Sequence, residues 1–129
     1  MAEPFETVNL RYMVDDVPAA VDWYATHFGF DVQMSTPAFG SVQRGNLRLL
    51  LSGKASSAGR PMPDGRQPEP GGWNRFQVIT DDIEAEAARL RAAGVKSRND
   101  ILSGPGGSQV LVEDPAGNVV ELFQPAALR

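Results

Sequence analysis

The chain has 129 residues, no cysteine and a net charge of −4 at pH 7. This length suits one domain with a sizeable core, and the missing cysteines exclude disulfides, thiolate catalysis and Cys-ligated zinc. The acidic balance argues against a nucleic-acid partner and against an acidic membrane surface. We see no run of apolar residues that could span a bilayer and no signal peptide, so we expect a cytoplasmic protein.

The first part of the chain predicts a strand, a helix and three further strands. Residues 7–14 are β-branched and apolar with an alternating character, which is typical of a strand. Asp15 and Asp16 can cap a helix over 19–28, Pro18 is tolerated in its first turn, and Gly29 can end it. Short strands are then expected over 31–35, 39–44 and 47–52, with a turn at Gly45-Asn46 between the last two.

The segment 53–72 is rich in Gly, Pro, Ser and Arg and has no hydrophobic periodicity. A loop of this length without secondary structure is usually a linker or a functional lid in a compact domain.

After this loop the pattern starts again. Residues 74–80 predict a strand, and Asp81 with Asp82 precedes a helix that Gly94 ends. Asp81 and Glu84 have the spacing of a capping box. Residues 96–102 indicate a weak strand.

Residues 108–124 are typical of a β-hairpin whose turn is Asp114-Pro115-Ala116-Gly117-Asn118. Pro115 presets φ, Gly117 can adopt positive φ, and Asp114 can cap its own backbone. Glu121 interrupts the second apolar strand. An unpaired carboxylate costs several kcal/mol to bury, so we expect Glu121 to have a partner or a use.

The two halves form an internal repeat of one strand, one helix and three strands. Asp16 and Asp82 occupy matching places at an offset of 66, and Gly45 matches Gly117 at an offset of 72. These offsets match Asn9 to Arg75 and Leu49 to Glu121.

The segments DDVPAAVDWY…FGF and EDPAGNVVELF, together with the repeat, resemble the vicinal oxygen chelate superfamily. That group includes glyoxalase I, extradiol dioxygenases, fosfomycin-resistance enzymes and bleomycin-resistance proteins. The resemblance implies an α+β fold of two tandem βαβββ modules whose curved mixed sheets form a cup. The modules would span about 5–53 and 73–125 within one domain of residues 1–129. The resemblance also implies a homodimer, in which the cup is often completed across two chains.

Metal-dependent members of this superfamily hold a divalent ion with four residues, one from the first and one from the last strand of each module. Carried over, these positions are Asn9, Leu49, Arg75 and Glu121. Leu49 has no donor atom, Arg75 is a permanent cation, and Asn9 offers one neutral carbonyl oxygen. We therefore expect no metal and no cofactor.

Strand alternation predicts which side chains face the cup. From the first module these are Asn9, Arg11, Met13, Leu47, Leu49 and Leu51; from the second they are Arg75, Gln77, Ile79, Glu121 and Phe123. Trp73 and Phe39 stand near the rim and could stack on a flat ligand. The candidate ligand-binding residues are Asn9, Arg11, Phe39, Leu49, Trp73, Arg75, Gln77, Glu121 and Phe123. The competing interpretation is that Arg75 and Glu121 neutralise each other across a vestigial site.

Three functions fit these observations. The first is a metal-free protein that binds a small organic molecule and sequesters an antibiotic or other aromatic metabolite. The second is a glyoxalase- or dioxygenase-like enzyme, either a metal-dependent lyase or dioxygenase with an atypical ligand set or a metal-free isomerase. The isomerase would use Glu121 as a base, which Arg75 nearby would oppose. The third is a non-catalytic partner domain. The one histidine, His27, lies at a helix C-terminus, which favours a structural role.

Overall fold

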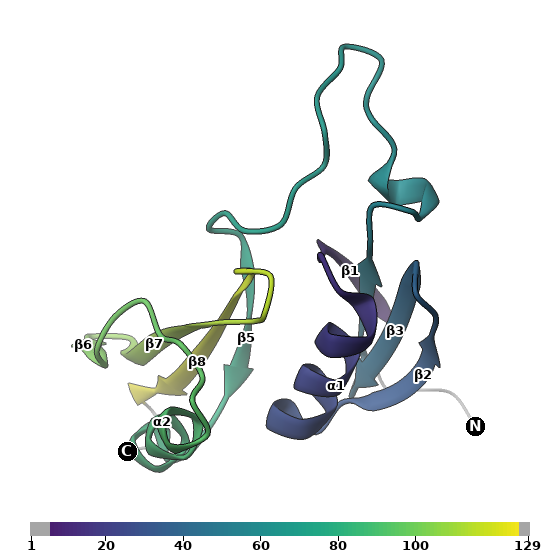
Figure 1. Ribbon diagram of the computed structural model, residues 1–129. Helices are drawn as coiled ribbons and strands as arrows, with labels where there is room; N and C mark the ends of the chain where they lie inside the picture. The colour runs from purple at the N-terminus through teal and green to yellow at the C-terminus, as the bar shows by residue number, and fades with distance from the viewer. Residues whose placement is uncertain (1–5, 127–129) are drawn as a thin grey trace. The chain divides into compact units, whose positions relative to one another are not determined.

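The computed structural model describes residues 6–126. The chain divides between Gly71 and Gly72 into two compact units, here the first unit and the second unit. Each unit contains one helix packed on a four-stranded mixed sheet, and the order of elements is strand, helix and three strands (Figure 1). The predicted α+β class with two βαβββ modules is confirmed. No helix in the described part of the chain is long and apolar enough to cross a bilayer.

The first unit contains β1 (Val8–Met13), α1 (Val17–Phe28), β2 (Asp31–Ser35), β3 (Phe39–Arg44) and β4 (Leu47–Ser52). Its sheet has the order β1-β4-β3-β2, with β1 parallel to β4 and the other pairs antiparallel. The three strands after the helix lie at the predicted residues.

Helix α1 begins two residues earlier than predicted, at Val17. The Asp16 carboxylate accepts a hydrogen bond from the Ala19 amide at 3.1 Å, so Asp16 is the N-cap, and Pro18 lies in the first turn. At the other end Gly29 adopts a φ of 66°, which favours glycine and ends the helix. These caps confirm the predicted signals.

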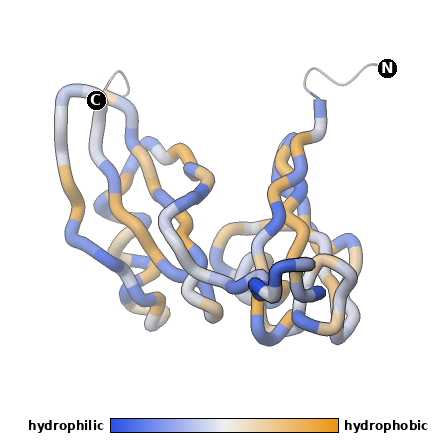
Figure 2. The backbone as a smooth tube through the Cα atoms, turned by 90° about the horizontal axis from the view of Figure 1, so that it is seen from above, coloured by the Kyte–Doolittle hydropathy of each residue, from blue (hydrophilic) through white to orange (hydrophobic). Residues whose placement is uncertain are grey.

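The core of the first unit lies between α1 and one face of the sheet. Tyr24 of α1 is fully buried, as are Val42, Leu49 and Leu51 of the strands. Gly40 permits the close approach, because a Cβ atom there would lie 2.5 Å from Val21 Cγ2. Apolar and polar residues alternate along β1 and β2, whereas β4 contains three consecutive leucines. Figure 2 shows the hydropathy of each residue along the backbone.

Between β4 and β5 (Arg75–Ile79) the chain is irregular apart from a short 3-10 helix, η1 (Ser57–Gly59), as Figure 1 shows. The predicted long loop is therefore present. Its role as a lid stays a prediction.

The second unit contains β5 (Arg75–Ile79), α2 (Ile83–Ala92), β6 (Leu102–Gly104), β7 (Gly107–Glu113) and β8 (Val119–Pro125). Its sheet has the order β5-β8-β7-β6, with β5 parallel to β8. The two sheets thus have the same topology.

The capping box predicted between Asp81 and Glu84 is wrong. Asp82 is the N-cap of α2, and its carboxylate accepts from the Ala85 amide at 3.0 Å. Glu84 is consequently the second helical residue, one position short of the place that a capping-box glutamate needs. The Ile83 amide instead donates to Gln124 Oε1 of β8 at 2.9 Å.

The strand predicted over 96–102 is also wrong. Only Ser97 forms an isolated bridge, to Val112, and the short β6 begins at Leu102. Asn99 explains the interruption, because its Oδ1 atom accepts the Leu111 amide at 2.9 Å in place of a backbone carbonyl. A side chain thus takes over one backbone hydrogen bond of a strand pair.

The hairpin of β7 and β8 is confirmed. In its turn, Asp114 Oδ1 accepts from the amides of Ala116 and Asn118, both at 2.9 Å. Asp114 and Asn118 are buried, and Gly117 has a φ of 90°. The turn is therefore held by its own side chains.

Candidate ligand-binding faces of the two sheets

Each sheet has one face covered by its helix and one face turned away from it, here called the distal face. In the second sheet, α2 lies on the side of Val110 and Val112, which line a small cavity together with Leu90 of α2. The β5–β8 register pairs Arg75 with Val119, Gln77 with Glu121 and Ile79 with Phe123 on the other side. These six residues, with Leu111 opposite Glu121, make the second distal face.

Glu121 is the centre of that face, and both of its carboxylate oxygens are engaged. Arg75 Nε donates to Oε1 and Gln77 Nε2 donates to Oε2, each at 2.7 Å. The Glu121 side chain is only 6% exposed, whereas that of Arg75 is 29% exposed. The buried negative charge is therefore compensated by one cation and one amide. In the structure Arg75 and Glu121 form an ion pair with each other, as the competing interpretation of these two residues expects.

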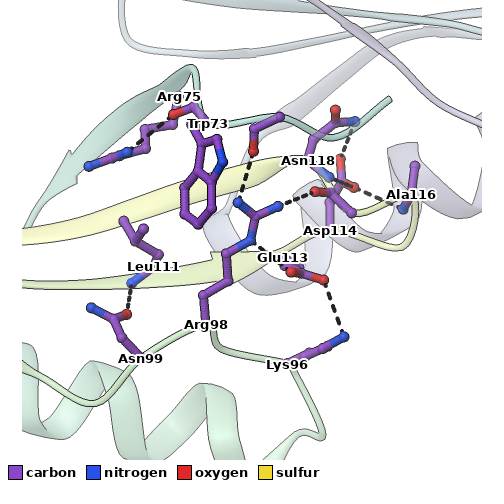
Figure 3. A network of polar contacts seen from close by, with 12 residues as sticks. Trp73, Arg75, Lys96, Arg98, Asn99, Leu111, Glu113, Asp114, Ala116 and Asn118 are labelled. Carbon is purple, nitrogen blue, oxygen red and sulfur yellow. Dashed lines mark hydrogen bonds and ion pairs between the residues drawn. The ribbon is translucent and has the colours of Figure 1, made fainter. Parts of the chain in front are cut away.

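Arg75 also fixes the backbone ahead of β5, because its Nη1 donates to the Trp73 carbonyl oxygen at 3.1 Å. The Trp73 side chain lies on the surface, and the residue is 67% exposed. Arg98 Cζ lies 4.4 Å from the centre of the indole ring, which is a cation–π geometry (Figure 3). Trp73 is thus an exposed aromatic ring held at a defined place.

The Arg98 guanidinium, shown in Figure 3, ties three parts of the second unit together. Its Nε donates to Glu113 Oε2 at 2.8 Å, its Nη1 to the Gly72 carbonyl at 2.8 Å, and its Nη2 to the Gly117 carbonyl at 3.0 Å. Sequence reasoning missed Arg98, because it lies in an irregular segment and its partners are distant in sequence. No local motif signals such a residue.

The first distal face differs from the prediction at β4. The β1–β4 register pairs Asn9 with Arg48, Arg11 with Leu50 and Met13 with Ser52. Leu47, Leu49 and Leu51 pair instead with Val8, Leu10 and Tyr12 on the helix side. The expectation that these three leucines share a face with Asn9 is wrong, and Leu49 is fully buried in the core.

The error has a simple physical source. The Gly-Asn motif matched Leu47 to Val119, yet Leu47 points to the helix side of its sheet and Val119 to the distal side. A shift of one residue exchanges the two faces of a strand. When Asn9 is taken as the counterpart of Arg75, the β1–β4 and β5–β8 registers can be compared position by position. Leu50 is then the counterpart of Glu121, and Arg11 is the counterpart of Gln77.

The first distal face is mostly polar. Arg11 Nη1 donates to Ser52 Oγ at 2.7 Å, and Arg48 Nε donates to Asn9 Oδ1 at 3.0 Å. Gln33 links β2 to β3 through hydrogen bonds with Ser41 and Gln43. Phe39 lies opposite Ser52 on the same face and is half-buried.

The donor set does not fit the divalent ion of metal-dependent relatives. Glu121 already has a donor on each oxygen, and Asn9 Oδ1 accepts from Arg48. Neither Leu49 nor Leu50 has a donor atom. Within residues 6–126 no three His, Cys, Asp or Glu side chains are grouped to hold a metal.

The other sequence candidates have local contacts. His27 lies in the last turn of α1, and its ring centre is 5.3 Å from that of Trp23. Gly104 pairs with Gly107, so residues 104–107 form the turn between β6 and β7.

Residues 7–122 match the sequence profile of the Glyoxalase/Bleomycin resistance protein/Dioxygenase superfamily. The chain belongs to this superfamily. The match includes both sheets except for the last residues of β8. The recognition drawn from the hairpin and the first helix is therefore confirmed, and with it the superfamily's fold class.

Solved structures of this superfamily share the fold. A lactoylglutathione lyase from Agrobacterium tumefaciens has a TM-score of 0.73 and 22% identity, over 95% of this chain and 96% of that one. TnmS3, an antibiotic binding protein from Streptomyces sp. CB03234, has a TM-score of 0.71 and 27% identity, over 98% and 100%. A superfamily member from Sphaerobacter thermophilus DSM 20745 has a TM-score of 0.73 and 24% identity, over 93% and 97%. Curated protein sequences contain no match.

Proposed function

We propose that this protein is a metal-free member of the superfamily that binds a small organic molecule, and that it sequesters an antibiotic or another aromatic metabolite. The observation that supports this most strongly is the engagement of Glu121 by Arg75 and Gln77, each at 2.7 Å. A carboxylate that is fully used inside the protein leaves little for a metal or a substrate proton. Binding is the activity that such a face can still perform.

The proposed ligand contacts are the polar and aromatic side chains of the distal faces and their borders. Trp73 offers an exposed ring for stacking, a contact worth about 0.5–1.5 kcal/mol beyond the area buried. Sites for small molecules combine apolar surface with a few polar groups that orient the ligand. On the first unit the proposed contacts are Asn9, Arg11 and Phe39, and on the second unit they are Trp73, Arg75, Gln77 and Phe123.

The likeness to TnmS3 supports an antibiotic-like ligand. That protein is described as an antibiotic binding protein and shares 27% of its residues with this chain over nearly the full length of both. Among the structural relatives reported above it has the highest sequence identity, so we place its class of ligand first in the test.

The experiment uses the two tryptophans of the chain. Dialysed protein is titrated with a panel of aromatic and antibiotic-like compounds while Trp fluorescence and the melting temperature are recorded. A ligand at one hundred times its Kd should add about 2.7 kcal/mol to the free energy of unfolding. The variant Trp23→Phe leaves Trp73 as the reporter, and Trp73→Phe is its matched control. A panel without any response in either signal would contradict the proposal.

The homodimer implied by the resemblance and the cytoplasmic location expected from the sequence are part of the same proposal. Strand β2 is an edge strand whose side chains are all exposed, and Val32 and Met34 are about half exposed. An exposed edge with apolar side chains favours contact with another chain. Light scattering at several protein concentrations measures the oligomeric state.

A further inference from the structure

The two distal faces carry opposite chemistry at matching positions. In the second unit, Gln77 and Arg75 surround a carboxylate, that of Glu121. In the first unit the positions of Gln77 and Glu121 are occupied by Arg11 and Leu50, which lie opposite each other in the β1–β4 register. The first unit therefore has the guanidinium of Arg11 where the second has the amide of Gln77. It has no carboxylate at the position of Glu121, because Leu50 lies there.

A second cation lies beside the first. Arg48 pairs with Asn9, so it is the diagonal neighbour of Arg11 across β1 and β4. Diagonal neighbours in a sheet are about 7–8 Å apart, which a long side chain can span. Both guanidinium groups can therefore reach the same ligand group.

Neither arginine has an ionic partner among residues 6–126. Arg11 donates to the Ser52 hydroxyl and Arg48 to the Asn9 amide oxygen, and both acceptors are neutral. A guanidinium carries five N–H donors, so most donors of this pair are not used by these bonds. The carboxylate of Asp31 faces the same side on β2, but two strand spacings separate β2 from β4, about 10 Å.

Ser52 holds the guanidinium of Arg11 in place. It is fully buried, and its Oγ atom accepts from Arg11 Nη1 at 2.7 Å. The hydroxyl can hold one edge of the guanidinium in place and leave the rest of the fork to a ligand. A planar fork fixed in this way matches the two oxygens of a carboxylate or a phosphate.

We propose that the distal face of the first sheet is an oxyanion-binding site in which Arg11 and Arg48 bind a carboxylate or phosphate group of an organic ligand. This inference rests on the proposed binding function and adds the charge of the ligand to it. The ligand supplies the negative charge that Glu121 supplies inside the second unit. The site selects organic acids over neutral molecules of the same shape.

The test compares 2-naphthoate, 2-naphthyl phosphate and the neutral 2-naphthamide by calorimetric titration of the full chain. At least one anion should bind about tenfold or more tightly than the amide, because a charge-assisted hydrogen bond is worth roughly twice a neutral one. Which of the two anions binds more tightly distinguishes a carboxylate site from a phosphate site. Equal affinity for all three probes, or no binding of either anion, overturns the inference.

Three variants make the test specific to this face. Arg11→Gln installs the residue that the second unit has at this position and should remove the preference for the anion. Leu50→Glu should do the same by giving Arg11 an internal partner. Arg44→Gln removes the same charge from the end of β3, where Arg44 pairs with Leu47 on the helix side, and should leave the preference unchanged. An equal loss in Arg44→Gln would reveal a general charge effect and overturn the inference.

The outcome is separable from that of the proposed function. If the aromatic panel binds while no naphthyl anion is preferred, only the oxyanion site fails. If no antibiotic-like compound of the panel binds but the anion preference is present and depends on Arg11, the proposal of an antibiotic ligand fails and the oxyanion site stands.

Discussion

Arg75 and Glu121 form an ion pair across β5 and β8, with 2.7 Å between Nε and Oε1, and Glu121 is the more deeply buried partner. The family resemblance implies that metal-dependent members carry ligands at these two positions. Substitution of Arg75 and substitution of Glu121 should change the stability by different amounts. Removal of Arg75 leaves a buried carboxylate without its cation, whereas removal of Glu121 leaves a partly exposed cation.

Arg75→Ala should therefore destabilise the protein by about 1–3 kcal/mol, which is less than a fully buried pair would cost because Arg75 is partly exposed. Glu121→Leu should cost less. The double variant Arg75→Met with Glu121→Leu should be more stable than Arg75→Ala, since it removes both charges and keeps apolar volume. Urea unfolding measures all three, and a double variant that is the least stable contradicts this account of the pair.

Arg98 holds Trp73 through its contact with the ring and its bond to the Gly72 carbonyl. Arg98→Lys keeps the charge but cannot make the forked set of hydrogen bonds. In a Trp23→Phe background we expect a lower fluorescence anisotropy of Trp73 and an affinity for aromatic ligands reduced about fivefold. The control is Lys96→Gln, which removes a mostly exposed cation from Glu113. If both variants lower affinity equally, Arg98 does not position Trp73.

Gly40→Ala tests the packing of α1 on β3. The new Cβ atom would lie 2.5 Å from Val21 Cγ2 and 3.1 Å from Val17 Cγ1, so the free energy of unfolding should fall by about 1–3 kcal/mol. Gly106→Ala is the control, since nothing lies within 4 Å of a Cβ atom there. Val21→Ala combined with Gly40→Ala should cost less than the sum of the two single changes. Thermal and urea unfolding decide whether the helix packs this closely.

Asp114 is predicted to be essential to the β7–β8 turn, because one of its oxygens accepts two backbone amides in a buried place. Asp114→Ala should reduce stability by about 2–3 kcal/mol, since buried donors lose their acceptor. Asp114→Asn keeps an acceptor oxygen and should cost clearly less. Equal costs for the two variants would show that the charge, and not the hydrogen bonding, holds the turn.

The sequence predicted the strands and helices well where local chemistry decides them. The caps at Asp16 and Gly29 and the turn around Asp114 depend on residues close together in the chain, and all are present. The failures depend on pairing between distant segments. Asn99 interrupts a strand through its bond to Leu111, and the register of β4 against β1 decides the face of Leu49.

Only part of the candidate site could be predicted from the sequence. The pairing of Arg75 with Glu121 follows from strand alternation, which predicts that both side chains lie on the same face, and in the β5–β8 register they are diagonal neighbours. Arg98 could not be predicted, since its contacts with Gly72, Trp73 and Gly117 come from an irregular segment that has no periodicity. The position of Leu50 required the strand register itself.

The most direct test of the central claim is a calorimetric titration of chelator-treated protein with Mn²⁺, Ni²⁺ and Zn²⁺, with Glu121→Ala titrated in parallel. We expect no stoichiometric binding of any of these ions and no difference between the two proteins, because Arg75 and Gln77 occupy the carboxylate. One ion bound per chain with high affinity, and lost in Glu121→Ala, would contradict it.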